Sequence, residues 1–154
     1  MLTIKIRKYD RLSNERKWKS VEFKIVENRG GGDCLFMSLS EFISRLQTGA
    51  FYLDILHDQL RKKIVSHIVT PDQDDDTKFS TWRRYSQAIK FTLEKHVPFF
   101  RTYTTENQDP VLEGQAREAY EQYMGQAGVY GTYVEVCAAM EIYGFNATLV
   151  EKVC

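Results

Sequence analysis

The sequence contains few cysteines and prolines, no long apolar run and no excess charge of either sign. Three cysteines and three prolines occur among 154 residues, and 21 Lys and Arg residues balance 21 Asp and Glu residues. A protein that binds nucleic acid through its phosphates normally has a basic excess, so nucleic acid is not expected as a partner. The apolar runs are short, whereas a membrane-spanning helix needs about 20 residues. Residues 1–7 alternate apolar and polar side chains, unlike a signal peptide. We therefore expect a single domain, residues 1–154, in the cytoplasm or nucleus and without a membrane partner.

The number and spacing of the cysteines and histidines argue against a disulfide framework and against a structural zinc site. Cys34, Cys137 and Cys154 are an odd number, far apart, with no Cys-x-x-Cys pair, which fits a reducing compartment better than a disulfide framework. The three histidines, His57, His67 and His96, are not near paired cysteines at the spacing of zinc ligands. The sequence therefore predicts no metal site and no cofactor.

The remaining composition is that of a folded domain, with 43% hydrophobic and 13% aromatic residues. Period-two alternation predicts an N-terminal β-hairpin in residues 1–26, and apolar, β-branched residues predict a strand at 146–153. Between them, in the loop and helical part 27–145, apolar residues recur at helical spacing in five segments. We predict helices over 34–46, 51–68, 82–96 and 110–124, and a fifth helix with Val136, Cys137, Met140 and Tyr143 on one side and Gly144 as its C-cap. The expected fold class is α+β, with helices packed on a small β-sheet.

The loop before the first predicted helix has the composition of a catalytic site. Gly31, Gly32 and Asp33 precede Cys34, which begins the helix. A thiol at a helix N-terminus faces unpaired N–H groups and the positive end of the helix dipole, which favour the thiolate. Preceding glycines allow backbone N–H groups to converge on one point and stabilise an oxyanion. The pattern thus indicates a nucleophilic cysteine, but a buried structural Cys34 after a tight glycine turn remains an alternative.

The same residues resemble the nucleophile motif of the OTU (ovarian tumour) family of cysteine proteases, which is usually Asp-Gly-Asn-Cys-Leu-Phe followed by a helix. Here the segment reads Gly31-Gly32-Asp33-Cys34-Leu35-Phe36. The resemblance extends over residues 26–150 through further matches in the same order: Leu60-Arg61, Tyr120 or Tyr123, Met124, Tyr130-Gly131 and Glu135-Val136.

The resemblance implies a deubiquitinase, a thiol-dependent hydrolase with a papain-related fold that lacks its C-terminal strands here. Cys34 would attack the carbonyl after the C-terminal glycine of ubiquitin or a ubiquitin-like modifier. The backbone N–H groups of Cys34 and of Gly31 or Gly32 would form the oxyanion hole. Tyr130, Gly131 and Glu135 would be neighbours of the site, although for these residues a purely structural role is the favoured interpretation.

Two departures from the family pattern keep other functions open. Gly31 stands where the family has Asp, and the family's general-base histidine follows later strands, beyond Cys154. None of the three histidines is assigned the base role. The first alternative is therefore a catalytically inactive OTU-like domain that binds ubiquitin or another protein. A second is an α+β interaction domain with a structural Cys34. We also predict that the strand 146–153 offers an edge for self-association.

Overall fold

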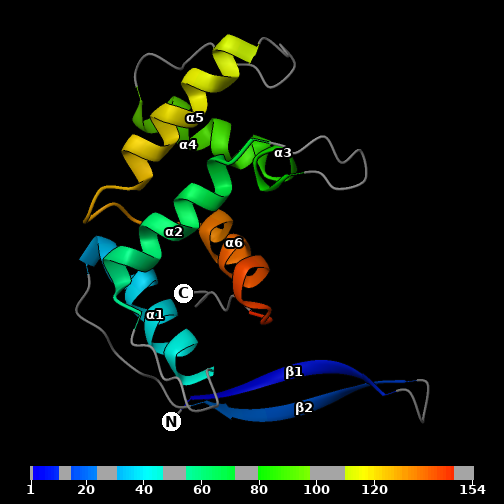
Figure 1. The fold of residues 1–154 in the computed structure, drawn as a ribbon. Coiled ribbons are helices and arrows are strands. Elements are labelled where there is room, and N and C mark those ends of the chain that lie inside the picture. The colour runs from blue at the N-terminus through cyan, green and yellow to red at the C-terminus, as the bar shows by residue number, and fades with distance from the viewer. Residues whose placement is uncertain are drawn as a thin grey trace.

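The structure is a computed structural model that describes residues 2–10, 15–23, 31–46, 55–71, 80–97 and 110–147. Figure 1 shows two strands followed by a body of helices. The elements, in chain order, are β1 (Leu2–Asp10), β2 (Glu15–Phe23), the short 3₁₀ helix η1 (Gly31–Asp33), α1 (Cys34–Leu46), α2 (His57–Val69), α3 (Thr81–Arg84), α4 (Ser86–His96), α5 (Pro110–Met124) and α6 (Tyr133–Tyr143).

The two strands form an antiparallel hairpin within the segment where residue alternation predicts one. Their register pairs Leu2 with Phe23 and Ile4 with Val21. β1 and β2 are hydrogen-bonded to each other and form a sheet of two strands. In Figure 1 the hairpin lies below the end of α1, outside the helical body.

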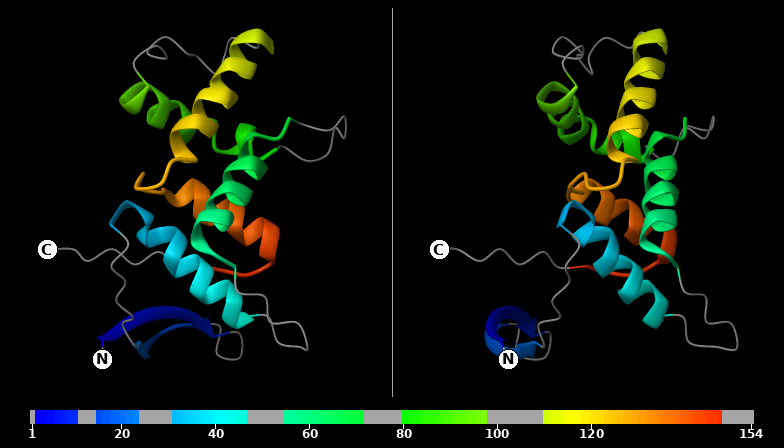
Figure 2. Two further views of the ribbon diagram at one scale, coloured as in Figure 1. Left: turned by 60° about the vertical axis from the view of Figure 1, so that its left-hand side comes forward. Right: turned by 90° about the vertical axis from the view of Figure 1, so that its left-hand side faces the viewer.

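Helix α2 is the centre of the hydrophobic core. It packs against α1, α3, α5 and α6, and both turned views in Figure 2 show α6 beside α1 and α2. Its inward face carries Leu60, Ile64, Val65 and Ile68, all of which are essentially inaccessible to solvent. This spacing of three and four residues keeps apolar side chains on one face of a helix. The element that holds the molecule together is therefore a helix.

The prediction of an α+β fold with helices packed on a small sheet is wrong. Between residues 31 and 147, the described residues contain helices and no strand, and the helices bury their apolar faces against one another. The alternation in residues 2–23 produces a hairpin that pairs only with itself. Residues 145–147 are irregular, and the rest of the strand predicted at 146–153 lies outside the described residues.

Several predicted helix bounds are confirmed. α1 begins at Cys34, α5 ends at Met124 and α6 ends at Tyr143, with Gly144 in the left-handed conformation at φ 68°. This conformation favours glycine at a helix C-terminus. α2 begins later than expected, at His57. The backbone of Ile55 is held instead by two serines of α1: Ser40 donates to its carbonyl, and its N–H donates to Ser44 Oγ at 3.4 Å.

The single helix predicted over 82–96 is two helices, α3 and α4, which are separated by Tyr85. Tyr85 has φ −110° and ψ 23°, outside the helical range. Its ring meets the ring of Tyr133 edge-on, with 6.1 Å between centroids. Trp82 in α3 and Ile89 in α4 are both buried in the core. Apolar spacing alone cannot reveal such a bend, because the pattern of buried residues continues across it.

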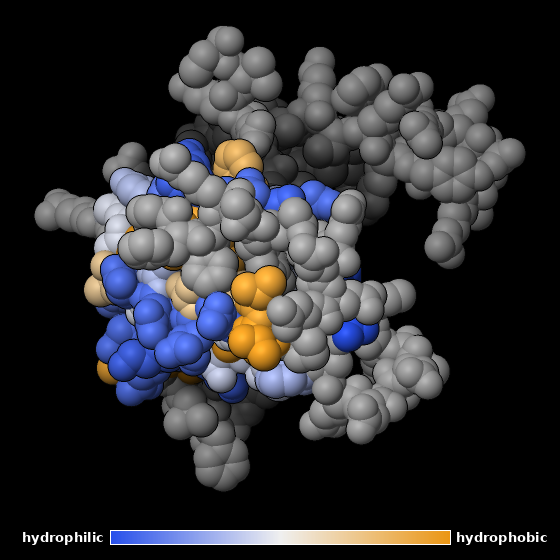
Figure 3. Space-filling view, turned by 90° about the horizontal axis from the view of Figure 1, so that it is seen from above, coloured by the Kyte–Doolittle hydropathy of each residue, from blue (hydrophilic) through white to orange (hydrophobic). Residues whose placement is uncertain are grey.

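Hydrophobic side chains are also exposed at the end of the molecule formed by α4 and α5. Phe91 in α4 and Val111 in α5 are 64% and 67% exposed. Figure 3 views the molecule from this end and shows a hydrophobic patch beside strongly hydrophilic residues. Among the described helices, none has both the length and the apolar character that would let it cross a membrane.

Candidate functional site

Cys34 lies where the 3₁₀ turn η1 passes directly into α1. The residue is partly buried, and Gly31 at the start of the turn is exposed with φ +50°. A positive φ is strained for residues that have a Cβ atom, which accounts for a glycine at this position. The predicted placement of Cys34 as the first residue of α1 is confirmed.

The residue before Cys34 is fixed by a contact with a distant loop. Asp33 Oδ1 accepts a hydrogen bond from the Gly128 N–H at 2.9 Å and another from Arg61 Nη2 at 2.7 Å. Gly128 lies in the loop between α5 and α6, and Arg61 lies in α2. Three separate parts of the chain therefore meet immediately before the thiol.

Arg61 is the buried centre of this arrangement, with its side chain only 2% exposed. Its two terminal nitrogens also donate to three backbone carbonyls: those of Met124 at 2.9 Å, Val129 at 2.8 Å and Gly32 at 3.3 Å. The guanidinium lies 3.9 Å from the centre of the Phe36 ring. A buried cation needs compensation of this kind, since its desolvation is costly.

Close approach of glycine backbones brings the two loops together. A Cβ atom on Gly32 would lie 1.7 Å from the Gly128 carbonyl oxygen, so no larger residue fits there. Gly128 itself has φ +80°. A Cβ atom on Gly131 would lie 2.5 Å from Leu35 Cδ2 and 3.1 Å from the Phe36 ring. The loop between α5 and α6 is therefore packed against both the residues before Cys34 and those after it.

The contacts of Asp33 favour its charged form. Its pKa lies below the ordinary 3.8 mainly because the Gly128 N–H donates to the carboxylate. Partial burial opposes this shift, while the hydrogen bond and charge of Arg61, and the charge of His57, add to it. An ionised carboxylate thus lies next to Cys34 in the chain, with Arg61 as its counter-ion.

Of the predicted neighbours, Gly131 lies against this region, and Glu135 has a different setting. Gly131 contacts the start of α1 as described above, and the adjacent Tyr130 is 69% exposed. Glu135 is fully buried. One of its carboxyl oxygens accepts from the Tyr120 hydroxyl, and the other accepts from the N–H and the hydroxyl of Thr132 at 2.6 and 2.7 Å.

The contacts of Glu135 form a capping box at the start of α6. Thr132 caps the helix and Glu135 returns a hydrogen bond to its backbone. Burial raises the pKa of the Tyr120 hydroxyl, and the neighbouring Glu135 raises it further. Tyr120 thus donates to Glu135 as a neutral hydroxyl. Because both carboxyl oxygens are used within the fold, Glu135 fixes the start of α6 and thereby the loop that touches Asp33.

Two of the three histidines make contacts elsewhere in the fold. His96 stacks on Tyr123 with 5.0 Å between ring centroids. His67 Nε2 lies 3.1 Å from Glu141 Oε2. His57, the first residue of α2, is close enough to Asp33 for its charge to lower the pKa of that carboxyl.

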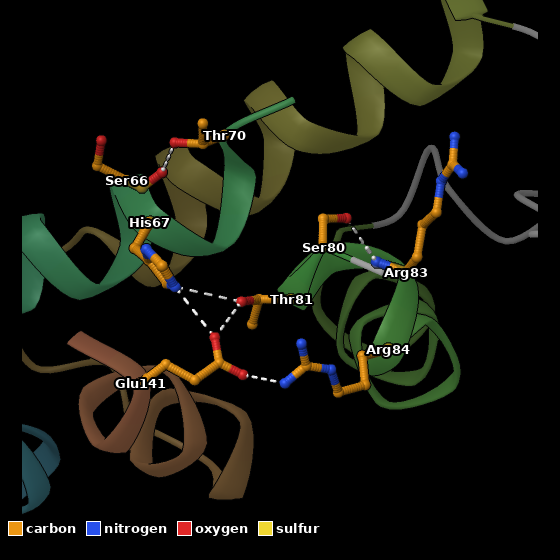
Figure 4. Close-up of polar contacts among 8 residues, drawn as sticks. All are labelled: Ser66, His67, Thr70, Ser80, Thr81, Arg83, Arg84 and Glu141. Carbon is orange, nitrogen blue, oxygen red and sulfur yellow. Dashed lines mark hydrogen bonds and ion pairs between the residues drawn. The ribbon is translucent and has the colours of Figure 1, made fainter. Parts of the chain in front are cut away.

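His67 belongs to a second polar cluster, which joins α2, α3 and α6 (Figure 4). Thr81 donates to Glu141 at 2.6 Å, and Arg84 pairs with the other oxygen of the same carboxylate. Burial raises the pKa of Glu141, but the hydrogen bonds from Thr81 and His67 and the charge of Arg84 outweigh burial and leave it below its usual value.

The second cluster lacks the arrangement of a hydrolytic triad. In a triad, the hydroxyl and the acid contact different ring nitrogens of the histidine. Here Thr81 and Glu141 both approach Nε2 of His67, at 3.3 and 3.1 Å. His67 lies six residues beyond Arg61, or about 9 Å further along α2. We interpret the cluster as a structural link between three helices.

Of the two other cysteines, the structure describes Cys137. Cys137 is partly buried in α6, and its hydrogen bond with Tyr85 raises the pKa of that tyrosine. Cys154 lies outside the described residues. Within the described part of the chain, no group of three or more His, Cys, Asp or Glu side chains could hold a metal ion.

Comparisons of this chain with protein-family models, with curated proteins and with solved structures found no match.

Sequence reasoning did not assign a role to Arg61 or Gly128. Arg61 appears in the sequence only as part of a Leu-Arg match, yet its position offers a signal of its own. It lies three residues before Ile64 and four before Val65, so it belongs to the buried face of α2. A charged residue on an apolar face requires a buried partner, and that partner is the segment before Cys34.

Proposed function

We propose that this protein is an OTU-like cysteine hydrolase that cleaves bonds after the C-terminal glycine of ubiquitin or a ubiquitin-like modifier, with Cys34 as the nucleophile. The observation that carries the proposal is the fixation of the segment preceding Cys34. Asp33 is bound to both Arg61 and Gly128, and Gly32 lies directly against the Gly128 backbone. A rigidly held loop before a thiol at the start of a helix is the arrangement that nucleophilic catalysis needs.

The proposal rests on the motif residues and their contacts, and not on the fold. The helical body lacks the sheet that the resemblance implies. Two of the matched segments, Leu60-Arg61 and Tyr130-Gly131, nevertheless contact the Cys34 segment.

The reaction would follow the usual course of a thiol hydrolase. The Cys34 sulfur bonds to the carbonyl carbon, and the carbon–nitrogen bond to the amine breaks. The thiol proton passes to a base and from it to the departing amine. Water then cleaves the thioester, which frees the carboxylate and restores the thiol. In the family that the Cys34 motif resembles this base is a histidine, and none of the three histidines of this sequence is assigned that role.

A second candidate function is a non-catalytic domain that binds ubiquitin. The observation in its favour is that His67 and His96 are held in other contacts, with Glu141 and Tyr123. This candidate uses the same surface around Cys34 but needs no proton transfer.

One experiment separates these functions. The 154-residue chain is incubated with ubiquitin whose C-terminal glycine carries a thiol-reactive electrophile. Addition of sulfur to such an electrophile needs no protonated leaving amine, so the test does not depend on a general acid. We expect labelling of the wild type and of Cys137→Ala, and none of Cys34→Ala.

The other outcomes are equally informative. If ubiquitin perturbs the NMR resonances of the chain but Cys34 is not labelled, the domain binds without catalysis. If labelling survives in Cys34→Ala, or if neither labelling nor binding at millimolar ubiquitin occurs, the proposal is wrong.

A further inference from the structure

Arg61 contacts the chain on both sides of Cys34. Its Nη2 atom donates to the Gly32 carbonyl and to Asp33, and its guanidinium lies over the ring of Phe36. The contact therefore spans residues 32 to 36, with the thiol inside this interval. Such a contact fixes the backbone from which the thiol projects.

Asp33 and Arg61 form an ion pair immediately before Cys34. Asp33, next to Cys34, has a side chain that is 23% exposed, whereas the side chain of Arg61 is 2% exposed. An unpaired carboxylate here would oppose the approach of any anion to the thiol and would disfavour negative charge in the reaction. The charge of His57 also acts on Asp33.

The geometry requires the forked shape of arginine. The two terminal nitrogens serve four acceptors that belong to α5, the loop after it and the η1 turn. The remaining nitrogen, Nε, is buried and has no hydrogen-bond partner. Lysine, with a single nitrogen at its tip, cannot span these acceptors. An arginine used only to fill the core would not need this set of partners.

We infer that Arg61 is a positioning residue for the nucleophile: it neutralises Asp33 and holds the backbone around Cys34 in place. The inference rests on the proposed function, in which Cys34 reacts. It predicts that the electrical environment of the thiol is set by the Arg61–Asp33 pair. The inference also predicts that the backbone conformation of residues 32–36 depends on the hydrogen bonds made by the two terminal nitrogens of Arg61.

The test uses two small reagents in place of ubiquitin, so its failure is distinguishable from failure of the proposed function. Iodoacetamide is neutral and iodoacetate is negatively charged, and both alkylate thiolates. The ratio of their rates at Cys34, followed by mass spectrometry of the Cys34 peptide, reports the local charge. Greater access to the thiol alone changes both rates alike, whereas unfolding also changes their ratio, so only variants that keep the wild-type circular dichroism spectrum are compared.

The variants shift this ratio in opposite directions. Arg61→Met leaves Asp33 unpaired, so the iodoacetate-to-iodoacetamide ratio falls by about two- to fivefold at low ionic strength. Asp33→Asn leaves Arg61 unpaired, so the ratio rises by a similar factor. The double variant returns to the wild-type ratio. Arg61→Lys keeps the ratio near the wild-type value but changes both rates together, because the charge remains while the forked contacts are lost.

Lys62→Met is the matched control, since it removes one positive charge from an exposed position next to Arg61 in α2. We expect Lys62→Met to leave the iodoacetate-to-iodoacetamide ratio at Cys34 unchanged. Where Arg61→Met is too unstable to study, Asp33→Asn tests the inference by itself. An unchanged ratio in Asp33→Asn, or shifts of the same sign in Asp33→Asn and Arg61→Met, would overturn the inference.

Discussion

The Nη2 atom of Arg61 lies 2.7 Å from Oδ1 of Asp33, the residue that immediately precedes Cys34. The same carboxyl oxygen accepts from the N–H of Gly128. These contacts join the η1 turn, α2 and the loop between α5 and α6 into one unit. The environment of Cys34 is therefore determined by long-range contacts, and substitutions far from it in the sequence should alter it.

Gly31→Ala and Gly32→Ala should differ greatly in their effect on stability. A Cβ atom on Gly31 meets nothing within 4 Å, so the cost is that of its positive φ, about 1 kcal/mol. A Cβ atom on Gly32 collides with the backbone of Gly128, and we expect a loss of about 3 kcal/mol or more. Urea unfolding of both variants measures the difference. Equal losses would mean that the two loops do not meet as described.

Tyr120→Phe should destabilise the protein by about 2 kcal/mol, because it leaves a buried carboxyl oxygen of Glu135 without its donor. Tyr123→Phe is the matched control in the same helix. Tyr123 is only partly buried, and we expect its loss to stay within about 0.5 kcal/mol. The comparison is made by thermal and urea unfolding. A loss in Tyr120→Phe no larger than that of the control would contradict the buried contact.

Acid should destabilise the protein partly through Asp33 and Glu141, whose pKa values are both lowered by folding. For a lowered pKa, the stabilisation is present above the unfolded-state value, near 4, and is lost as the pH falls through the folded-state value. The free energy of unfolding should therefore fall over the acidic interval below about pH 4.

Charge-neutral variants test this acid dependence. Asp33→Asn and Glu141→Gln should each make the fall less steep, and the double variant should flatten it further. The measurement is urea unfolding at several pH values in that interval. A slope in Asp33→Asn equal to that of the wild type would show that its carboxylate does not contribute.

The helices were predictable because their signals are local. The apolar spacing in α5 and the glycine that ends α6 depend on neighbouring residues, and both predictions are confirmed. The break at Tyr85 was not predictable in this way. At the break, the ring of Tyr85 meets that of Tyr133 in α6, a contact between residues far apart in the chain that local spacing cannot indicate.

The error in fold class has a similar origin. The alternation in β1 and β2 predicts strands correctly, but it does not say what covers them. The apolar faces of the helices, for example that of α2 around Leu60, are satisfied by other helices. Which apolar surface packs on which is a long-range property that neither the alternation nor the helical spacing specifies.

The candidate site also combines residues that are adjacent in the sequence with residues that only folding brings together. The glycines and the thiol are contiguous, so the sequence indicates them together. Arg61 and Gly128 lie 28 and 95 positions from Asp33. Their role follows only when the chain is folded, although an arginine on the apolar face of α2 is a clue to a buried partner.

The most direct test of the account is the mass of the chain after incubation with ubiquitin bearing a C-terminal electrophile. We predict a single ubiquitin adduct, with the modified peptide containing Cys34 and with Cys137 unmodified. Absence of an adduct at Cys34, or attachment only at another residue, would contradict the assignment of Cys34 as the nucleophile.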